Sequence, residues 1–519
     1  MRLASGPVAD SPESKQVLTS SQHSQRIQDS PPSATSLSLV LLLLCSSFFA
    51  LYHSNTAYNT DEVWSVKTAQ LNYTAGLAAL KADVHPPLYF LILHSWIRLF
   101  GTGERAVRSL SGLFYILSVF AVYGIGRELY GGKTALLCAA IYLSSPLAIL
   151  AAQFARMYSL LSLLSILSTW LYLQFSIKPR DSRLTFALYI AINILGTFAH
   201  VAFFFVLFGQ IIFQLFFYRR VRNKRFVLAI VLSLVPYLFL WVPILSGQLA
   251  TSREGLAWVK KPGLSMLADL LLQYGGTFWL IVPLLLYVSW RSGFHALSRF
   301  SKPNITSLPF WLLAITLLTP LLISEVKPIF NSRLAIVGLH LFALSIGAFT
   351  GRGANYLLPL AVIVLSITFL TVVHPASEPC DNREMANYLS RTANEGDVLI
   401  FTSLTRSSID YYLERTPATR KLFETSFPAE IDQHPGYEGR IRDPGRRAAL
   451  DREAQSLIDE IATMQSPART RRIFFFHGFH PEIDAIVMQH LRDRFELLTG
   501  QGIQCSEGSL YFKEVSVYR

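Results

Sequence analysis

Long apolar segments recur between residues 37 and 374 of this 519-residue chain, and they constrain its fold more than any other feature. An α-helix needs about 20 predominantly apolar residues to cross a bilayer. Only 15% of the residues are charged, whereas soluble domains carry about 25%. The sequence therefore predicts a polytopic α-helical membrane protein with about eleven transmembrane helices. The expected spans are 37–52, 107–127, 133–150, 156–176, 184–200, 202–218, 226–246, 268–290, 307–323, 333–350 and 356–374.

Basic residues set the expected orientation of these spans. Lys and Arg gather in alternate connections, most densely between residues 219 and 225, and cytoplasmic loops carry such an excess. The N-terminus is then cytoplasmic, whereas the first loop (53–106) and the C-terminus are extracytoplasmic. The net charge of +12 fits cytoplasmic loops and contacts with anionic membrane lipids. No basic stripe interleaved with aromatics indicates a nucleic-acid partner.

One apolar segment, Leu88–Phe100, is expected to lie at the membrane surface rather than to cross it. It is only about a dozen residues long, it contains His94 and Arg98, and it follows Pro86-Pro87. These properties suit an interfacial or re-entrant helix. Counting it as a span would also put either the early or the late basic loops on the wrong side. We therefore expect an amphipathic first extracytoplasmic loop.

Composition divides the chain into three parts. Residues 1–36 are rich in Ser, Gln and Pro and are typical of a disordered cytoplasmic tail. Residues 37–374 form the membrane domain, and residues 375–519 form a small extracytoplasmic domain. In this last part short apolar runs alternate with helical patterns, which predicts an α/β fold with a mainly parallel sheet. The strands are expected at 398–401, 473–476 and 510–512, and the helices at 381–392, 448–464 and 482–494.

Four cysteines are present, and none has the spacing of a structural zinc site. Cys380 and Cys505 both lie in the C-terminal part and could pair in an oxidising compartment, but the sequence leaves the pairing open. His477 and His480 follow an expected strand in a Gly-containing loop. Two histidines in such a loop are more often structural than metal ligands.

Adjacent carboxylates stand in the first loop at Asp61-Glu62. Neighbouring carboxylates repel, so one of them tends to have a raised pKa or a cation beside it, and a general base for a hydroxyl needs such a group. The alternative is that both acids are simply solvated. The neighbouring Val63, Trp64 and Val66 favour a segment that lies on the membrane surface and holds the acids at the lipid boundary. Asp61 and Glu62 are therefore the candidate catalytic residues.

The same loop contains Asp83 and His85, directly before the pair Pro86-Pro87. Proline at a helix start is favourable, so Asp83 and His85 are expected to project from the mouth of the next helix. Histidine can bind phosphate, ligate a metal or transfer a proton. Asp83 and His85 are thus candidate ligands of a divalent metal ion, although such a tripeptide in isolation is more often a surface loop.

Two arginines, Arg156 and Arg333, begin apolar segments on the same expected side as the acids. The forked guanidinium group is suited to phosphate, so both are candidates for binding a lipid phosphate. Lys327 is a further candidate. The alternative is that these charges only snorkel to the headgroups.

Four segments together resemble the glycosyltransferases of the GT-C superfamily. They are Asp61-Glu62, the sequence DVHPPLY at 83–89, LFGTGERAVRSLSGL at 99–113 and FARMYSL at 154–160. The combination is most similar to the branch of protein O-mannosyltransferases, aminoarabinose transferases and related bacterial enzymes. The resemblance covers about residues 37–350.

This resemblance implies an integral enzyme of a bacterial plasma (inner) membrane. It would move a sugar, with inversion, from a polyprenyl-phosphate-linked donor to an extracytoplasmic lipid, glycan or protein acceptor. Asp61 would act on the acceptor hydroxyl, and Glu62 would support Asp61 or bind a divalent cation. The substrate-binding residues would be His85, Tyr89, Arg156, Tyr158, Lys327 and Arg333.

Three other functions fit a polytopic chain. A transporter or flippase of lipid-linked saccharides should show inverted repeats and helices broken at midplane depth, and neither is evident. A polysaccharide ligase or polymerase is expected to place its key residues in a large late loop. A membrane scaffold that presents the C-terminal domain would leave the first loop unexplained. The sequence specifies neither the sugar nor the acceptor.

Overall fold

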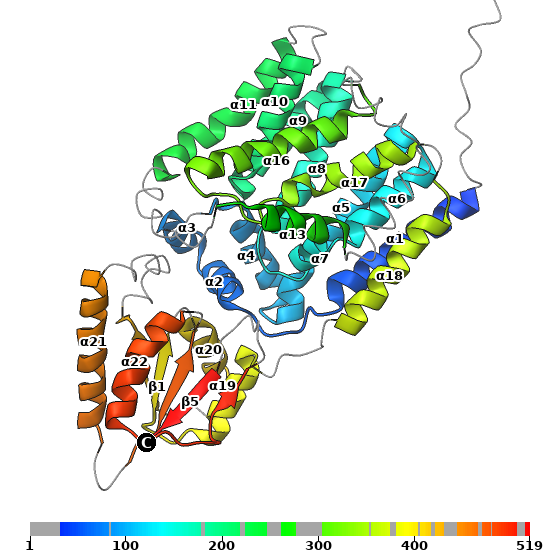
Figure 1. Cartoon of the computed structure of the whole chain (residues 1–519). Helices are drawn as coiled ribbons and strands as arrows, with labels where there is room; N and C mark the ends of the chain where they lie inside the picture. Colours follow the sequence, from blue (N-terminus) through cyan, green and yellow to red (C-terminus); the bar gives the residue numbers. More distant parts are fainter. Residues whose placement is uncertain are drawn as a thin grey trace, which may run out of the picture.

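The structure is a computed structural model, and its helices build one large body with a smaller α/β domain beside it (Figure 1). It describes residues 32–82, 85–177, 182–217, 224–245, 261–276, 304–351, 354–373, 380–402, 405–416, 421–429, 444–465, 470–478, 480–505 and 514–519. Residues 1–31 of the expected tail (1–36) therefore lie outside the described residues. The first helix, α1, already begins at Pro32.

The membrane body is a bundle of apolar helices around a continuous hydrophobic core. Two π-helical turns, Leu173–Ile177 and Phe213–Phe217, extend α8 and α10. The helices are α1 (Pro32–Leu51), α2 (Thr60–Gln70), α3 (Tyr73–Ala82), α4 (Leu88–Phe100), α5 (Glu104–Tyr130), α6 (Gly132–Leu143), α7 (Pro146–Ala152), α8 (Tyr158–Tyr172), α9 (Arg183–Ala199), α10 (Phe203–Ile212), α11 (Lys224–Leu240), α13 (Leu264–Gly275), α16 (Leu308–Val326), α17 (Ile336–Thr350) and α18 (Leu357–Val373).

Among the described residues, three helices are long and apolar enough to cross a membrane. They are α5, α8 with its π-helical turn, and α16. The pair α6 and α7 forms a fourth candidate that is bent by 64°. The expected single span at 133–150 is broken here because Pro146 has no N–H for a continuous helix. Several other apolar helices are shorter. The apolar helices are those of a membrane protein, and the number of eleven spans stays a prediction.

The first connection between long helices folds into α2, α3 and α4. Helix α4 has 13 residues, which gives about 20 Å of length against the about 30 Å of a hydrocarbon core. Its buried residues Phe90, Leu93 and Ile97 face the body, whereas Leu99 and Phe100 are exposed. Helix α4 is thus an amphipathic helix that is too short to span, as its sequence predicts.

The C-terminal domain contains a five-stranded sheet in the order β2-β1-β3-β5-β4. Strand β1 pairs in parallel with β2 and β3, whereas β5 is antiparallel to β3 and β4. The sheet is therefore mixed rather than mainly parallel. The expected strand at 510–512 lies outside the described residues. The strands are β1 (Val398–Thr402), β2 (Phe423–Phe427), β3 (Ile473–His477), β4 (Ile503–Gln504) and β5 (Glu514–Tyr518).

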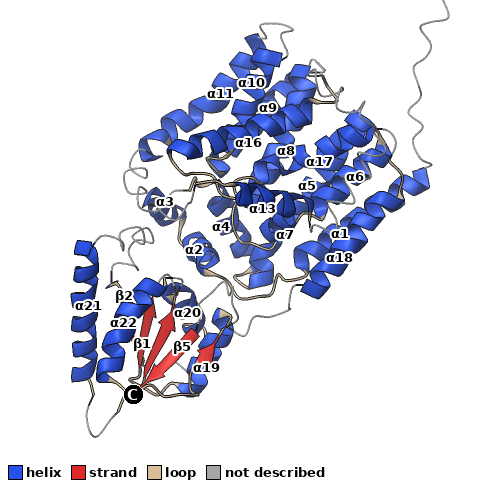
Figure 2. Ribbon diagram, viewed as in Figure 1, coloured by secondary structure: helices blue, strands red, loops and turns tan. Residues whose placement is uncertain are grey.

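Helices cover both faces of this sheet, as Figure 2 shows. They are α19 (Asn382–Thr392), α20 (Arg406–Leu413), α21 (Pro444–Thr463) and α22 (Pro481–Arg494). Side chains of β1 alternate between two cores, with Val398 and Ile400 in one and Leu399 and Phe401 in the other. A disulfide joins Cys380 to Cys505, so these two cysteines do pair.

The C-terminal domain contacts the first connection directly. Ala57 donates its backbone N–H to Asp381, and Tyr58 donates its backbone N–H to the Tyr412 hydroxyl. Figure 1 shows the domain at the end of the helical body where α2 lies. The two regions are consequently in direct contact.

Candidate active site

Helix α2 begins with a capping box that fixes the two adjacent acids. The Asn59 side chain accepts the backbone N–H of Glu62, and the Glu62 carboxylate accepts the backbone N–H of Asn59. This reciprocal pair satisfies two backbone donors that the helix itself cannot pair. Asp61 and Glu62 therefore both sit in the first turn, where the positive end of the helix dipole favours carboxylates.

Glu62 points into the protein and its carboxylate is fully engaged. Arg108 donates to Glu62 Oε1 at 2.8 Å through Nε and to Oε2 at 2.6 Å through Nη2. The backbone N–H of Ala155 adds a third donor at 2.9 Å. Glu62 is only 1% exposed. A bidentate, buried pair of this kind holds a position, and it leaves the Glu62 carboxylate no free face for a substrate.

Arg108 is the residue around which the preceding loop is wrapped. Its guanidinium also donates to the backbone carbonyls of Ser54, Thr56 and Ala57. The sequence reasoning did not single out Arg108. An arginine at the start of an expected span needs a partner for its charge, and this signal was present within the segment 99–113.

Asp61 faces outward from the same helix turn. Its side chain is 46% exposed, and its Oδ2 lies 3.2 Å from Arg333 Nη1. Burial alone would raise the pKa of the Asp61 carboxyl, but the positive charges of Arg156 and Arg333, helped by His85, hold that pKa below the ordinary value of an aspartate. Asp61 is therefore an ionised and accessible carboxylate.

Arg156 contacts the candidate residues of the first loop from the buried side. It is 4% exposed and donates to the backbone carbonyl of Asp61 at 3.3 Å and to Ser65 Oγ at 3.4 Å. Its Nη2 lies 3.3 Å from His85 Nε2. Because a guanidinium can only donate, His85 accepts at Nε2 in this contact.

Aromatic rings complete one side of the cluster. Arg333 lies over the Phe154 ring at 5.4 Å, and Phe154 stacks on Tyr158 with ring centroids 6.2 Å apart. The His200 ring lies 6.0 Å from that of Tyr158 and 5.9 Å from that of His85. Burial, reinforced by His85 and Arg156, lowers the pKa of His200 to about 3, so His200 is neutral at physiological pH.

Two expected substrate-binding residues lie apart from this arrangement. Tyr89 is completely buried, and its hydroxyl lies 3.2 Å from Ser111 Oγ on α5, so it packs within the body. Lys327 is exposed at the end of α16. The structure thus brings together Asp61, His85, Arg156, Tyr158 and Arg333.

The expected metal pair is only half described, because Asp83 lies outside the described residues. Within the described part of the chain, no group of three or more His, Cys, Asp or Glu side chains is close enough to hold a metal ion. His85 Nε2 lies 3.3 Å from Nη2 of Arg156, and the positive charge of this guanidinium disfavours a cation bound to His85. The guanidinium groups of Arg156 and Arg333 at this site are suited to binding an anion.

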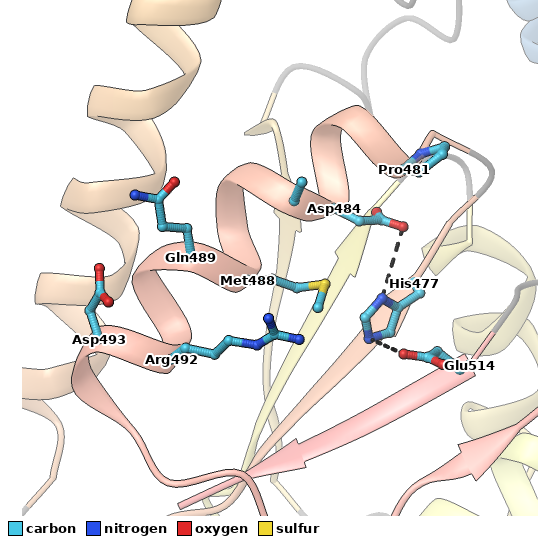
Figure 3. Close-up of a pocket in the computed structure, with 9 residues that line it drawn as sticks. His477, Pro481, Asp484, Met488, Gln489, Arg492, Asp493 and Glu514 are labelled. Carbon is cyan, nitrogen blue, oxygen red and sulfur yellow. Dashed lines mark ion pairs between the residues drawn. The ribbon is translucent and has the colours of Figure 1, made fainter.

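A second polar cluster lies at the carboxyl end of β3 in the C-terminal domain. His477 Nε2 lies 3.2 Å from Glu514, and its Nδ1 lies 4.0 Å from Asp484. Figure 3 shows these side chains beside a hollow of about 430 Å³, with Met488 and Arg492 pointing toward it from α22. Asp484 also accepts from the Thr402 hydroxyl at 2.6 Å. These bonds tie β1, β3, β5 and α22 together, which supports the structural interpretation of His477.

Comparisons with known proteins found one matching family model and several similar folds. Residues 84–242 match the family model of dolichyl-phosphate-mannose-protein mannosyltransferases. ArnT from Cupriavidus metallidurans bound to undecaprenyl phosphate has a similar fold, with a TM-score of 0.55 at 11% identity over 94% of this chain and 98% of that chain. Its apo state gives 0.54 at 11% identity over 93% and 98%. The oligosaccharyltransferase of Archaeoglobus fulgidus in complex with Zn and sulfate gives 0.47 at 12% identity over 85% and 68%. No curated protein sequence matches.

The match to the mannosyltransferase family model and the ArnT-like fold agree with the resemblance to GT-C glycosyltransferases that the motifs indicated. The matched segment, residues 84–242, is part of the helical body. That segment includes several of the residues described above: His85, Tyr89, Arg108, Phe154, Arg156, Tyr158 and His200.

Proposed function

We propose that the protein transfers a sugar from a polyprenyl-phosphate donor to a hydroxyl group on an extracytoplasmic lipid, glycan or protein, with inversion at the anomeric carbon. The observation that carries this proposal is the accessible Asp61 carboxylate, 3.2 Å from Arg333 and next to the buried Arg156. The ionised acid could take the proton of the acceptor hydroxyl, while the two guanidinium groups bind an anionic leaving group. The family match and the ArnT-like fold support a lipid-phosphate donor.

The donor phosphate and Asp61 would compete for the same cations. A guanidinium binds phosphate oxygens through paired donors, so an incoming donor draws Arg333 away from Asp61. The pKa of Asp61 then rises toward its ordinary value, which makes the carboxylate a better base at the moment the acceptor is present. The arginines meanwhile neutralise the charge that develops on the leaving phosphate.

Inversion adds a geometric requirement. In a single displacement the acceptor attacks the face of the sugar opposite the leaving phosphate. Asp61 and the phosphate-binding arginines must therefore stand on opposite sides of the sugar. Direct contact between Asp61 and Arg333 leaves no room for a sugar ring, so this pair has to separate when the donor binds.

The remaining residues would shape and hold the site. Glu62 and Arg108 fix the loop that carries Asp61, so we assign Glu62 a positioning role. Tyr158, with the neutral His200 beside it, offers ring surface and a hydrogen-bonding edge to the sugar. Tyr89 supports the packing of α4 on α5. No step in this proposal uses a metal ion.

Topology and domain division form part of the same proposal. The first loop and the C-terminal domain share one side of the membrane, and the basic connections place that side outside. The catalytic unit is then residues 37–374, and the extracytoplasmic domain is residues 375–519.

The decisive experiment incubates purified protein with radiolabelled polyprenyl-phosphate sugars, with and without EDTA. We expect label to leave the lipid, by transfer or by slow hydrolysis, and EDTA to have no effect. The anomeric configuration of the product, read by NMR, should be opposite to that of the donor. Failure to release sugar from any donor would instead support a flippase of lipid-linked saccharides.

A further inference from the structure

The backbone just before helix α2 is held by side chains of the C-terminal domain. The Tyr58 N–H donates to the Tyr412 hydroxyl at 2.7 Å, and the Tyr58 carbonyl accepts from Asn382 Nδ2 at 2.9 Å. The N–H of Ala57 donates to Asp381 Oδ2 at 3.2 Å. Three backbone polar groups of Ala57 and Tyr58 thus find partners at the start of α19 and on α20.

These partners matter because the whole contact is buried. Ala57 and Tyr58 are 0% exposed, and Asn382 is 1% exposed. A buried backbone N–H or carbonyl that loses its partner cannot form a replacement hydrogen bond with water. The conformation of Ala57 and Tyr58 consequently depends on the C-terminal domain.

A single hydroxyl links this loop to helix α5. While it accepts from Tyr58, the Tyr412 hydroxyl donates to Glu104 Oε1 at 2.7 Å. Arg383 binds the same Glu104 oxygen at 2.6 Å and reaches the backbone carbonyl of Asn55 at 3.1 Å. The Tyr412 hydroxyl therefore accepts one hydrogen bond and donates another, and its removal would break both.

From the other side, Arg108 donates to the carbonyl of Ala57 at 3.0 Å. The loop is thus clamped between the membrane body and the C-terminal domain. Asn59, the capping residue of α2, comes directly after Tyr58, and Asp61 follows two residues later. A change in the backbone at Tyr58 therefore reaches Asp61 through a short and rigid stretch of chain.

We propose that the face of α19 and α20 formed by Asp381, Asn382 and Tyr412 is a positioning element of the active site, which sets the place of the Asp61 carboxylate relative to Arg156 and Arg333. The C-terminal domain is then part of the catalytic machinery without touching the substrate. This inference rests on the proposed function, in which Asp61 acts on the acceptor.

The test compares two substitutions that each remove one oxygen from neighbouring residues in the full-length protein. Tyr412→Phe deletes the hydroxyl that binds Tyr58 and Glu104. Tyr411→Phe is the matched control, because its hydroxyl makes only a 3.5 Å contact to the Thr102 carbonyl and its ring, which packs on Tyr58, is kept.

For Tyr412→Phe we expect kcat to fall about 10- to 100-fold, which is the effect of a small displacement of a catalytic group. The donor KM should change less than about threefold, because the phosphate-binding arginines lie outside the contact. Tyr411→Phe should stay within about twofold of wild type in both constants. Asn382→Ala, which removes the donor to the Tyr58 carbonyl, repeats the test if Tyr412→Phe does not yield folded protein.

The pH profile separates positioning from simple loss of folded protein. The charged or titratable groups that face Asp61 are Arg156, Arg333 and His85, each from a different connection between helices. If Tyr412→Phe displaces Asp61 from them, the acid limb of kcat/KM moves to higher pH. Unfolding of a fraction of the sample would lower the amplitude and leave the limb in place.

Two failures are distinguishable. Wild-type protein that is inactive with every donor would overturn the proposed function and this inference together. Active wild-type protein with equal kcat and equal acid limbs in Tyr412→Phe and Tyr411→Phe would overturn only the inference.

Discussion

Two clusters in this protein combine a histidine with carboxylates, and they differ in the charges around them. In the first connection, His85 and Asp61 lie beside Arg156 and Arg333. In the C-terminal domain, His477 lies between Asp484 and Glu514. Residue types alone make the two clusters look alike.

The difference lies in which charges are still available. Asp484 is bound to Thr402 within the fold, and His477 is bound to Ser516 at 2.8 Å. Asp61 and Arg333 instead face each other with side chains 46% and 44% exposed. An ion pair that solvent reaches can be exchanged for a ligand at low cost, whereas a buried and satisfied network resists rearrangement. Both partners of the Asp61–Arg333 pair are accessible, whereas His477 is 6% exposed beside Glu514 at 38%, and this is why we propose the first cluster as the reactive one.

The largest expected effect is that of Asp61→Asn. Loss of the carboxylate should lower the transfer rate about 10²- to 10⁴-fold, measured by single-turnover release of labelled sugar. Asp451→Asn is the control, because Asp451 is an exposed acid of the C-terminal domain with 58% of its side chain accessible. Activity above half of wild type in Asp61→Asn would remove Asp61 from the mechanism.

Next in size is the substitution Glu62→Gln, which leaves the guanidinium of Arg108 buried without its counter-charge. Breaking one partner of a buried pair costs about 3–5 kcal/mol, so the Tm in detergent should fall clearly. Glu414→Gln breaks an exposed pair with Lys67 at 3.8 Å and should cost at most about 1 kcal/mol. Equal Tm values for the two variants would contradict the positioning role of Glu62.

Arg333→Gln should act mainly on donor binding. A hydrogen bond to a charged group contributes about 1.5–3 kcal/mol, so the donor KM is expected to rise roughly 10- to 100-fold. Arg494→Gln is the control, because Arg494 is 51% exposed and forms a comparable surface pair with Asp459 at 2.7 Å. An unchanged KM would assign phosphate binding to other residues.

A smaller effect concerns pH. The pKa of Asp61 is lowered, so its carboxylate is ionised above that value and is lost only as the pH falls through it. The acid limb of kcat/KM in wild type should therefore lie below pH about 4, the ordinary value of an aspartate. In Arg333→Gln this limb should shift upward. A wild-type limb well above pH about 4 would contradict the lowered pKa of Asp61.

The smallest effect belongs to the second cluster. His477→Asn should leave transfer within about twofold of wild type, because its contacts lie within the C-terminal domain. The Tm should fall modestly through loss of the bonds to Ser516 and Glu514. A strong fall in kcat at unchanged Tm would show that the two clusters are functionally coupled.

Hydrophobic patterning was sufficient to predict the helical body, the short α4 and most elements of the C-terminal domain. It missed the break at Pro146, because an apolar run reads the same whether its helix is straight or bent. It also missed the mixed sheet. Strands β4 and β5 follow each other in the chain and pair as antiparallel neighbours, and a buried apolar run carries no information on strand direction.

Chemistry-bearing motifs identified Asp61, His85, Arg156 and Arg333, which the fold then brought together. Tyr89 is buried with its hydroxyl near Ser111, so its predicted role in substrate binding stays a prediction. Tyr412 could not be predicted. Its role arises from a contact across 354 residues, and no local pattern records which backbone N–H a distant hydroxyl will meet.

That separation has a consequence for the order of events during synthesis. The loop that carries Asp61 is translated early, but its partners Asp381 and Tyr412 follow 324 and 354 residues later. In the proposed topology, the domain that supplies them crosses the membrane, and its disulfide joins Cys380 to Cys505. Until that domain is in place, the contacts of Ala57 and Tyr58 with Asp381 and Tyr412 cannot form. The proposed transferase activity is therefore expected only once the C-terminal domain has been synthesised and has docked.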